Sequence, residues 1–172
     1  METTTMTLRR NLDTCQHICD TLGIPYREVI NIKVNSRAKR RFGQCAEIEP
    51  NKFEIEISDR LLQKGVSQLT LMNTMLHELL HTCEGCMNHG RKWKAYAARL
   101  NAIGYDVKTR ATAAEAAEAP LIGNPYKYEV TCDRCGSTWK YMKRGAVVKA
   151  LQRDPNSCKC GCGSRDFKLI EL

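Results

Sequence analysis

Aromatic residues are scarce in this chain, and long apolar runs and a leader-like start are missing. Aromatics make up 6% of the 172 residues, which excludes an aromatic-rich core. No apolar stretch approaches the roughly 20 residues that span a bilayer. Residues 1–6 lack the charged and apolar regions of a signal peptide. We therefore expect no membrane partner and a cytoplasmic protein, nucleoid-associated if it is bacterial or phage-encoded.

Ten cysteines stand out against this background. Because the cytoplasm is reducing, cysteines there are interpreted first as free thiols or metal ligands and only then as disulfides. The sequence therefore directs attention to metal-binding spacings.

The chain is basic, with 27 Lys and Arg against 19 Asp and Glu and a formal charge of +8. Residues 120–172 alone carry ten basic and five acidic side chains. A basic balance suits a polyanionic partner such as nucleic acid. It equally suits a soluble protein whose net charge lies away from zero, and composition does not separate the two.

Hydrophobic periodicity predicts an α+β fold. We expect helices over residues 3–22, 67–83 and 91–103, and strands over 29–34, 41–48 and 53–57. This pattern describes an N-terminal helix, a small antiparallel three-stranded sheet, a central helix and a following helix. Beyond these, strand-like segments over 126–131 and 166–172 flank clustered cysteines.

The same features divide the chain into domains. Residues 109–119 are Ala-rich and low in complexity, which is typical of a linker or a frayed helix. We expect a first domain over residues 1–108, a linker over 109–124, and a zinc-ribbon module over 125–172.

The central helix carries the pattern His77-Glu78-Leu79-Leu80-His81. Two histidines four residues apart lie one turn apart on one helix face and can share a metal ion. In HExxH metallopeptidases the two imidazoles bind zinc, and the carboxylate is the general base for a zinc-bound water. We therefore predict a catalytic zinc site with Glu78 as the catalytic residue.

A catalytic zinc usually has three protein ligands and an open position. His89 is the expected third ligand. Because a continuous helix would carry it about 12 Å past His81, the helix must break between them, and Gly85 and Asn88 suit a turn.

The remaining histidine and the loop cysteines have other interpretations. His17, alone on the first helix, is interpreted as structural. Cys83 and Cys86 lie in the loop between His81 and His89, and their spacing is compatible with three roles: shaping the loop, forming a redox pair, or binding a second metal ion.

The C-terminal cysteines predict a structural zinc. Cys132 and Cys135, followed by Gly136, have the spacing of a zinc knuckle. The other half offers three thiols where two are needed, and we expect Cys158 and Cys162, with Cys160 as the alternative. In total we expect two Zn²⁺ ions, one catalytic and one structural.

Cations and an aromatic residue are interleaved in this module, as in nucleic-acid-binding proteins. The candidate DNA-binding residues are Arg134, Trp139, Lys140, Lys143 and Arg144. The alternative is a structural clip that closes against the first domain.

Residues 77–93 resemble the SprT-like (Spartan-related) zinc metallopeptidase family, in which HExxH is followed by a short loop and then His-Gly-x-x-aromatic, here His89-Gly90-Arg91-Lys92-Trp93. Residues 41–45 are similar to the family's Gly-x-Cys segment, and many members end in a zinc ribbon. The resemblance implies a zinc-dependent endopeptidase domain over residues 1–108. It also implies protein or peptide substrates, which in Spartan-type relatives are bound or crosslinked to DNA, with DNA switching the activity on.

Two other functions compete with this one. A zinc-stabilised DNA-binding or adaptor protein would have a structural HExxH site, but it would have no need of Glu78. A deformylase-like hydrolase would use an upstream cysteine such as Cys45 as third ligand, although His89 is better placed. If a substrate peptide is held by strand addition, strand 53–57 is expected to be the sheet edge that holds it.

Overall fold

The computed structural model describes residues 4–122 and 126–172. The chain forms two compact units, Met1–Pro120 and Leu121–Leu172, and each is described by itself. Within the described ranges, no helix combines the length and the apolar character needed to cross a membrane.

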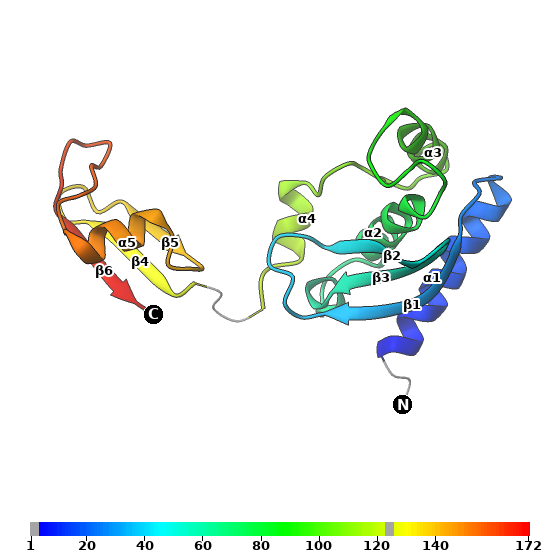
Figure 1. The fold of residues 1–172 in the computed structure, drawn as a ribbon, viewed down its shortest axis with the longest axis horizontal. Helices are drawn as coiled ribbons and strands as arrows, with labels where there is room; N and C mark the ends of the chain where they lie inside the picture. The colour runs from blue at the N-terminus through cyan, green and yellow to red at the C-terminus, as the bar shows by residue number, and fades with distance from the viewer. Residues whose placement is uncertain (1–3, 123–125) are drawn as a thin grey trace. The chain divides into compact units, whose positions relative to one another are not determined.

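The first unit is a three-stranded sheet covered by helices on one face (Figure 1). Its elements are α1 (Thr4–Thr21), β1 (Glu28–Asn35), β2 (Gly43–Glu49), β3 (Lys52–Ser58), the short 3-10 helix η1 (Asp59–Leu62), α2 (Gln68–His81), α3 (Arg91–Asn101) and α4 (Ala113–Glu118). The expected helices and strands are therefore present, with ends shifted by a few residues.

The sheet is mixed, and the expectation of an antiparallel sheet is wrong for one pair. The strand order is β1-β3-β2, with β3 antiparallel to β2 and parallel to β1. A tight hairpin at Asn51, whose φ is 63°, joins β2 to β3. The connection from β1 to β2, over residues 36–42, is longer. It leaves room for one strand between β1 and β2, and β3 occupies this position. Strand β3 is therefore central, and β2 is an edge strand.

The core lies between the sheet and the helices. Phe53, Ile55 and Ile57 of β3 are buried, while the alternate Glu54 and Glu56 face the other side, where both pair with Lys33. Helix α1 contributes a buried stripe of Leu8, Leu12, Cys15 and Cys19. Helix α2 is buried around most of its circumference, although Leu69 in its first turn is exposed.

Residues 109–119 belong to the first unit, which corrects the expected 1–108 domain and 109–124 linker. The Glu118 carboxylate accepts hydrogen bonds from the Ser67 backbone N–H and from Thr70 Oγ1, the latter at 2.7 Å. The carbonyl of Ala119, which is fully buried, accepts a bond from Arg60 Nε at 2.8 Å. These contacts hold α4 against the N-terminal end of α2. Residues 123–125 of the expected linker lie outside the described residues.

The second unit is a small antiparallel sheet with one helix. It contains β4 (Tyr128–Cys132), β5 (Thr138–Tyr141), α5 (Ala146–Arg153) and β6 (Phe167–Glu171), and its strand order is β5-β4-β6. Tyr128, Val130, Val148 and Leu151 are its buried apolar residues outside the cysteine cluster. Strands β4 and β6 agree with the expectation, whereas β5 and α5 had not been predicted.

Candidate metal centre

Helix α2 presents His77, Glu78 and His81 together. The helix begins at a Ser67 cap, whose side chain accepts a hydrogen bond from the Thr70 backbone N–H. It is anchored by its apolar residues in the core, so its C-terminal turn has a fixed orientation. Glu78 and His81 are buried, at 6% and 9% exposure, and His77 is half-buried.

The chain leaves the helix directly after His81, as the ligand spacing requires. Thr82 caps the helix, and Gly85 adopts a φ of 74°, which favours glycine. Cys83 and Cys86 are buried in the core, and burial raises the pKa of the Cys83 thiol to about 12. Such thiols anchor the loop as apolar side chains and are poorly suited to redox exchange.

The three histidines converge on one point. His77 Nε2 lies 3.2 Å from His81 Nε2 and 3.0 Å from His89 Nε2. Ligands on a tetrahedron with Zn–N distances of about 2.0–2.1 Å would be about 3.3 Å apart. The three nitrogens therefore fit one zinc ion. Neither His17 nor Cys45 belongs to this group among the described residues.

Backbone carbonyls set the tautomer of two of these imidazoles. His77 Nδ1 lies 2.7 Å from the Lys108 carbonyl, and His81 Nδ1 lies 2.7 Å from the Cys86 carbonyl. A carbonyl only accepts, so each Nδ1 carries the proton and each Nε2 offers its lone pair. Burial lowers the pKa of His77 to about 4, with a further contribution from His81. The neutral form that binds metals is thus favoured.

Trp93 of α3 forms one side of the metal site. It is 1% exposed, and its ring centroid lies 4.9 Å from that of His77, 5.9 Å from that of His81 and 4.6 Å from that of His89. Its contact with all three imidazoles restricts their rotation. The aromatic position of the His-Gly-x-x-aromatic pattern is therefore a packing partner of the ligands.

Glu78 is held beside the ligands without being one of them. Its carboxylate accepts a hydrogen bond from the Cys45 backbone N–H. Burial raises the pKa of Glu78 to about 8, although the charge of Arg41 and this hydrogen bond oppose the shift. A Cβ built on Gly43 would lie 2.5 Å from Glu78 Oε1. Glycine at position 43 therefore leaves the space that the carboxylate occupies.

A cleft of about 420 Å³ opens over this site. His77 and Glu78 form part of its floor, with Asn73 and Thr74 of α2 beside them. One wall is formed by residues 40–43, which lead into β2, and the other by residues 106–111. Gly43, the first residue of the edge strand β2, thus lines the same cleft as His77 and Glu78.

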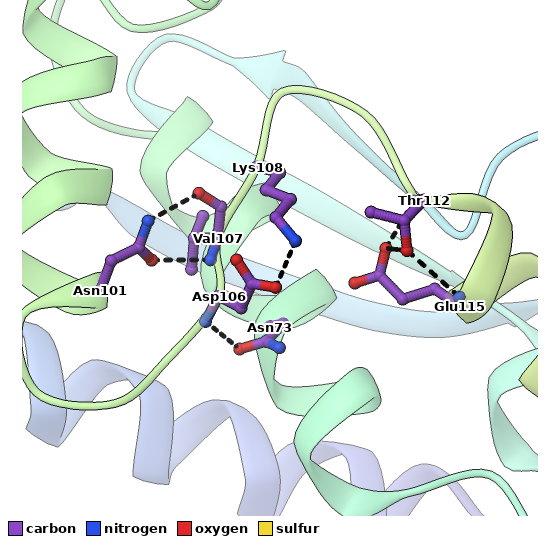
Figure 2. Close-up of polar contacts among 7 residues, drawn as sticks. All are labelled: Asn73, Asn101, Asp106, Val107, Lys108, Thr112 and Glu115. Atoms are coloured by element: carbon purple, nitrogen blue, oxygen red, sulfur yellow. Dashed lines mark hydrogen bonds and ion pairs between the residues drawn. The ribbon is translucent and has the colours of Figure 1, made fainter.

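Two asparagines hold the second wall in place (Figure 2). Asn101 bonds both backbone groups of Val107: its Oδ1 accepts from the N–H at 2.7 Å, and its Nδ2 donates to the carbonyl at 3.2 Å. Asn73 Oδ1 accepts from the Asp106 N–H at 3.0 Å. These bonds position the next residue, Lys108, whose carbonyl contacts His77. Neither asparagine has a sequence signal that points to this role.

Four thiols converge in the second unit: Cys132, Cys135, Cys160 and Cys162. The sulfurs of Cys132 and Cys162 are 3.7 Å apart, and those of Cys135 and Cys160 are 3.6 Å apart. A tetrahedral zinc with Zn–S distances of about 2.3 Å requires about 3.8 Å. The structure thus places Cys160, and not the expected Cys158, with the other three.

A tight turn accounts for this difference. The Gly163 N–H donates to the Cys160 carbonyl at 2.9 Å, and Gly163 has a φ of 90°. The Cys160 N–H donates to the Ser164 carbonyl, also at 2.9 Å. The turn brings Cys160 and Cys162 to the same side, although only one residue separates them. Cys158 lies before this turn.

The candidate nucleic-acid residues are all exposed. Two of them have partners within the unit, since Lys140 pairs with Glu129 at 3.5 Å and Arg144 bonds Gln152. Trp139 is 40% exposed and packs against Phe167 with ring centroids 6.2 Å apart. An indole face therefore remains available to a ligand.

A search of curated proteins finds no match. The SprT-like family model matches residues 12–114, a stretch that contains the three histidines, Glu78 and both walls of the cleft. Because this match covers more than half of the 172 residues, the chain belongs to the SprT-like family, and its first unit is a domain of the zinc-metallopeptidase type.

Proposed function

We propose that the first unit is a zinc-dependent endopeptidase in which Glu78 is the general base. One observation carries the proposal: three imidazole nitrogens with zinc-ligand spacing converge beside a cleft that is lined by one of them, His77, and by Glu78, a carboxylate that is not needed as a ligand. A purely structural zinc site has no use for that carboxylate or for the cleft.

His77, His81 and His89 would hold the zinc ion, which would supply the Lewis acidity that polarises a peptide carbonyl and acidifies a water molecule. Glu78 takes the proton of the attacking water and passes it to the departing amide nitrogen. Gly43 and the Cys45 N–H hold the Glu78 carboxylate in position for both transfers.

The edge strand β2 is the element that suits peptide binding. An extended peptide can add to a sheet edge by main-chain hydrogen bonds, which leaves its side chains to alternate between two faces. Strand β3, expected in this role from the sequence, is central and has no free edge. Peptide addition at β2 places a backbone carbonyl near the ligands, because β2 begins at Gly43 beside Glu78.

The test is a comparison of the zinc-loaded protein with its Glu78→Gln variant on unfolded casein and on histones, with and without single-stranded DNA. Glu78→Gln keeps the three imidazoles and should retain zinc while losing activity by about 10²–10⁴-fold. Equal activity of the two proteins, at equal zinc content, would rule out the assigned mechanism.

We further propose that the substrates are proteins bound or crosslinked to DNA, recognised with help from the second unit. Its exposed cations and the indole of Trp139 support this proposal, together with the activity that the family resemblance implies. Anisotropy with single-stranded DNA should show affinity that falls with salt, and a Trp139→Ala/Lys143→Gln double variant should bind more weakly. Salt-independent binding would contradict phosphate contacts.

A non-proteolytic DNA-binding or adaptor protein is the competing function. It predicts that Glu78→Gln changes nothing and that DNA binding survives removal of the metal from the histidines. Measuring both properties on the same preparations separates the two functions.

A further inference from the structure

The cleft over the metal site has an excess of unpaired positive charge. Arg40 and Arg41 line one wall, and Arg110 lines the other. All three side chains are exposed. Among residues 4–122 and 126–172, none of the three has a carboxylate within ion-pair distance.

The acidic residues of the cleft walls are already engaged elsewhere (Figure 2). Asp106 pairs with Lys108. The Glu115 carboxylate accepts hydrogen bonds from the Thr112 N–H at 2.6 Å and from Thr112 Oγ1 at 2.8 Å, which caps α4. Glu78, the third acidic residue of the lining, is buried and is influenced by the charge of Arg41 without forming an ion pair with it. None of the three carboxylates therefore pairs with the arginines. A ligand in the cleft therefore meets three unpaired cations in the same lining as His77 and Glu78.

The position of the arginines favours a peptide ligand. Arg41 lies two residues before Gly43, the first residue of the edge strand that runs into the cleft. A peptide added to this strand directs its side chains alternately to either side. Its carboxylates would then reach Arg40 and Arg41 on one wall and Arg110 on the other.

We propose that this cleft selects acidic peptide segments, with Asp or Glu side chains close to the bond that is hydrolysed. The inference rests on the proposed endopeptidase function and specifies its substrate class. Exposed charge pairs have modest energies, which correspond to about two- to fivefold in rate for each pair. Two acidic neighbours should therefore give about a tenfold preference, and this preference should shrink as salt screens the charges.

The experiment uses the zinc-loaded full chain. Cleavage sites in unfolded casein are first mapped by mass spectrometry, and fluorogenic peptides are then built around the fastest-cut bond, with Glu, Gln or Lys at the two flanking positions. The measured quantity is the ratio of kcat/KM for the Glu peptide to that for the Gln peptide. We expect about ten for the natural protein and about one for Arg40→Gln/Arg41→Gln/Arg110→Gln, with the Lys peptide cut most slowly by the natural protein.

The matched control is Arg37→Gln/Lys39→Gln/Lys64→Gln, which removes three positive charges outside the cleft lining. Its kcat/KM ratio for the Glu and Gln peptides should stay near ten. A ratio of one in the natural protein overturns the inference while leaving the peptidase intact. Absence of cleavage of every peptide instead contradicts the proposed function. If the three arginines set the affinity for single-stranded DNA and leave the peptide ratio at one, the cleft binds phosphates and the inference is wrong.

Discussion

The Glu78 side chain lies so close to the backbone of Gly43 that position 43 has no room for a side chain. A Cβ at position 43 would lie 2.5 Å from Oε1 and 2.6 Å from Cγ of Glu78. We predict that Gly43→Ala displaces the carboxylate and lowers kcat by about 10²-fold, as expected for a misplacement of about 1 Å. Zinc content should be unchanged because Glu78 is not a ligand.

Activity and bound zinc are measured together on the Gly43→Ala protein. Gly145→Ala is the control, since Gly145 has an ordinary φ and its Cβ would lie 3.9 Å from the nearest atom. Full activity of Gly43→Ala would show that the strand yields and that glycine is not required there.

Substitutions of Trp93 distinguish the contribution of ring packing at the metal site from that of hydrogen bonding. The Trp93 indole N–H is buried and has no hydrogen-bond partner among the described residues. We predict that Trp93→Phe changes the free energy of unfolding little, because it removes an unpaired donor and keeps an aromatic ring. Trp93→Ala should cost about 3–5 kcal/mol and weaken zinc binding. Urea unfolding of the zinc-loaded proteins measures the free energy of unfolding of the two variants. Similar losses of this free energy in Trp93→Phe and Trp93→Ala would contradict this account.

At the scale of elements, the segment after α3 connects the helix to the metal ligands through its backbone. Asn101 bonds both polar backbone groups of Val107, and the next carbonyl, that of Lys108, orients His77. We predict that Asn101→Ala lowers zinc affinity by about 10–100-fold, the range found when partners of metal ligands are removed. Competition with a chromophoric chelator measures the affinity.

Asn31→Ala is the matched control for this variant. Asn31 also bonds a neighbour, Glu54 Oε2 at 2.6 Å, but it lies in β1 and outside the cleft lining. If both asparagine variants weaken zinc binding equally, the loss is general destabilisation and not the release of His77.

The cysteine turn makes a sharp prediction about ligand choice. Cys160→Ser should reduce the zinc content of the chain by one ion, because it removes one of four converging sulfurs. Cys158→Ser, a matched change two residues away, should retain two ions. Mass spectrometry under native conditions counts the ions directly, and loss of zinc in Cys158→Ser would restore the ligand set first expected from spacing.

Local patterns in the sequence were sufficient for some elements and not for others. His77 and His81 follow from helical periodicity, and the break before His89 follows from the reach of a straight helix, since both depend on neighbours in the chain. The parallel pairing of β1 with β3 and the contact of Lys108 with His77 join residues far apart in sequence, which periodicity does not report. The choice of Cys160 depends on a turn in which both glycine conformation and carbonyl placement matter.

At the scale of the whole molecule, the two metal sites differ in ligands and in their importance for folding. Three imidazoles leave one position open, whereas four thiolates close their site. We predict that a chelator such as EDTA first removes the ion at the histidines and that the first unit stays folded, because it has its own apolar core. Loss of the second ion should unfold the second unit, which has few buried apolar residues.

Metal analysis and circular dichroism during the titration follow both events. The Cys160→Ser protein supplies the control, because its second unit should already be unfolded before chelator is added. Simultaneous loss of both ions, with one unfolding step, would contradict this separation.

The docking of α4 has a consequence for the evolution and the engineering of this chain. Residues 106–120 supply one wall of the cleft, the carbonyl that orients His77 and the carboxylate that bonds α2. A gene fusion or truncation that joins foreign sequence directly after residue 108 would therefore inherit the zinc ligands without residues 109–111 of the cleft wall and without α4. A junction after Pro120 would transfer both together, so the heritable module is longer than its HExxH motif and the flanking helices indicate.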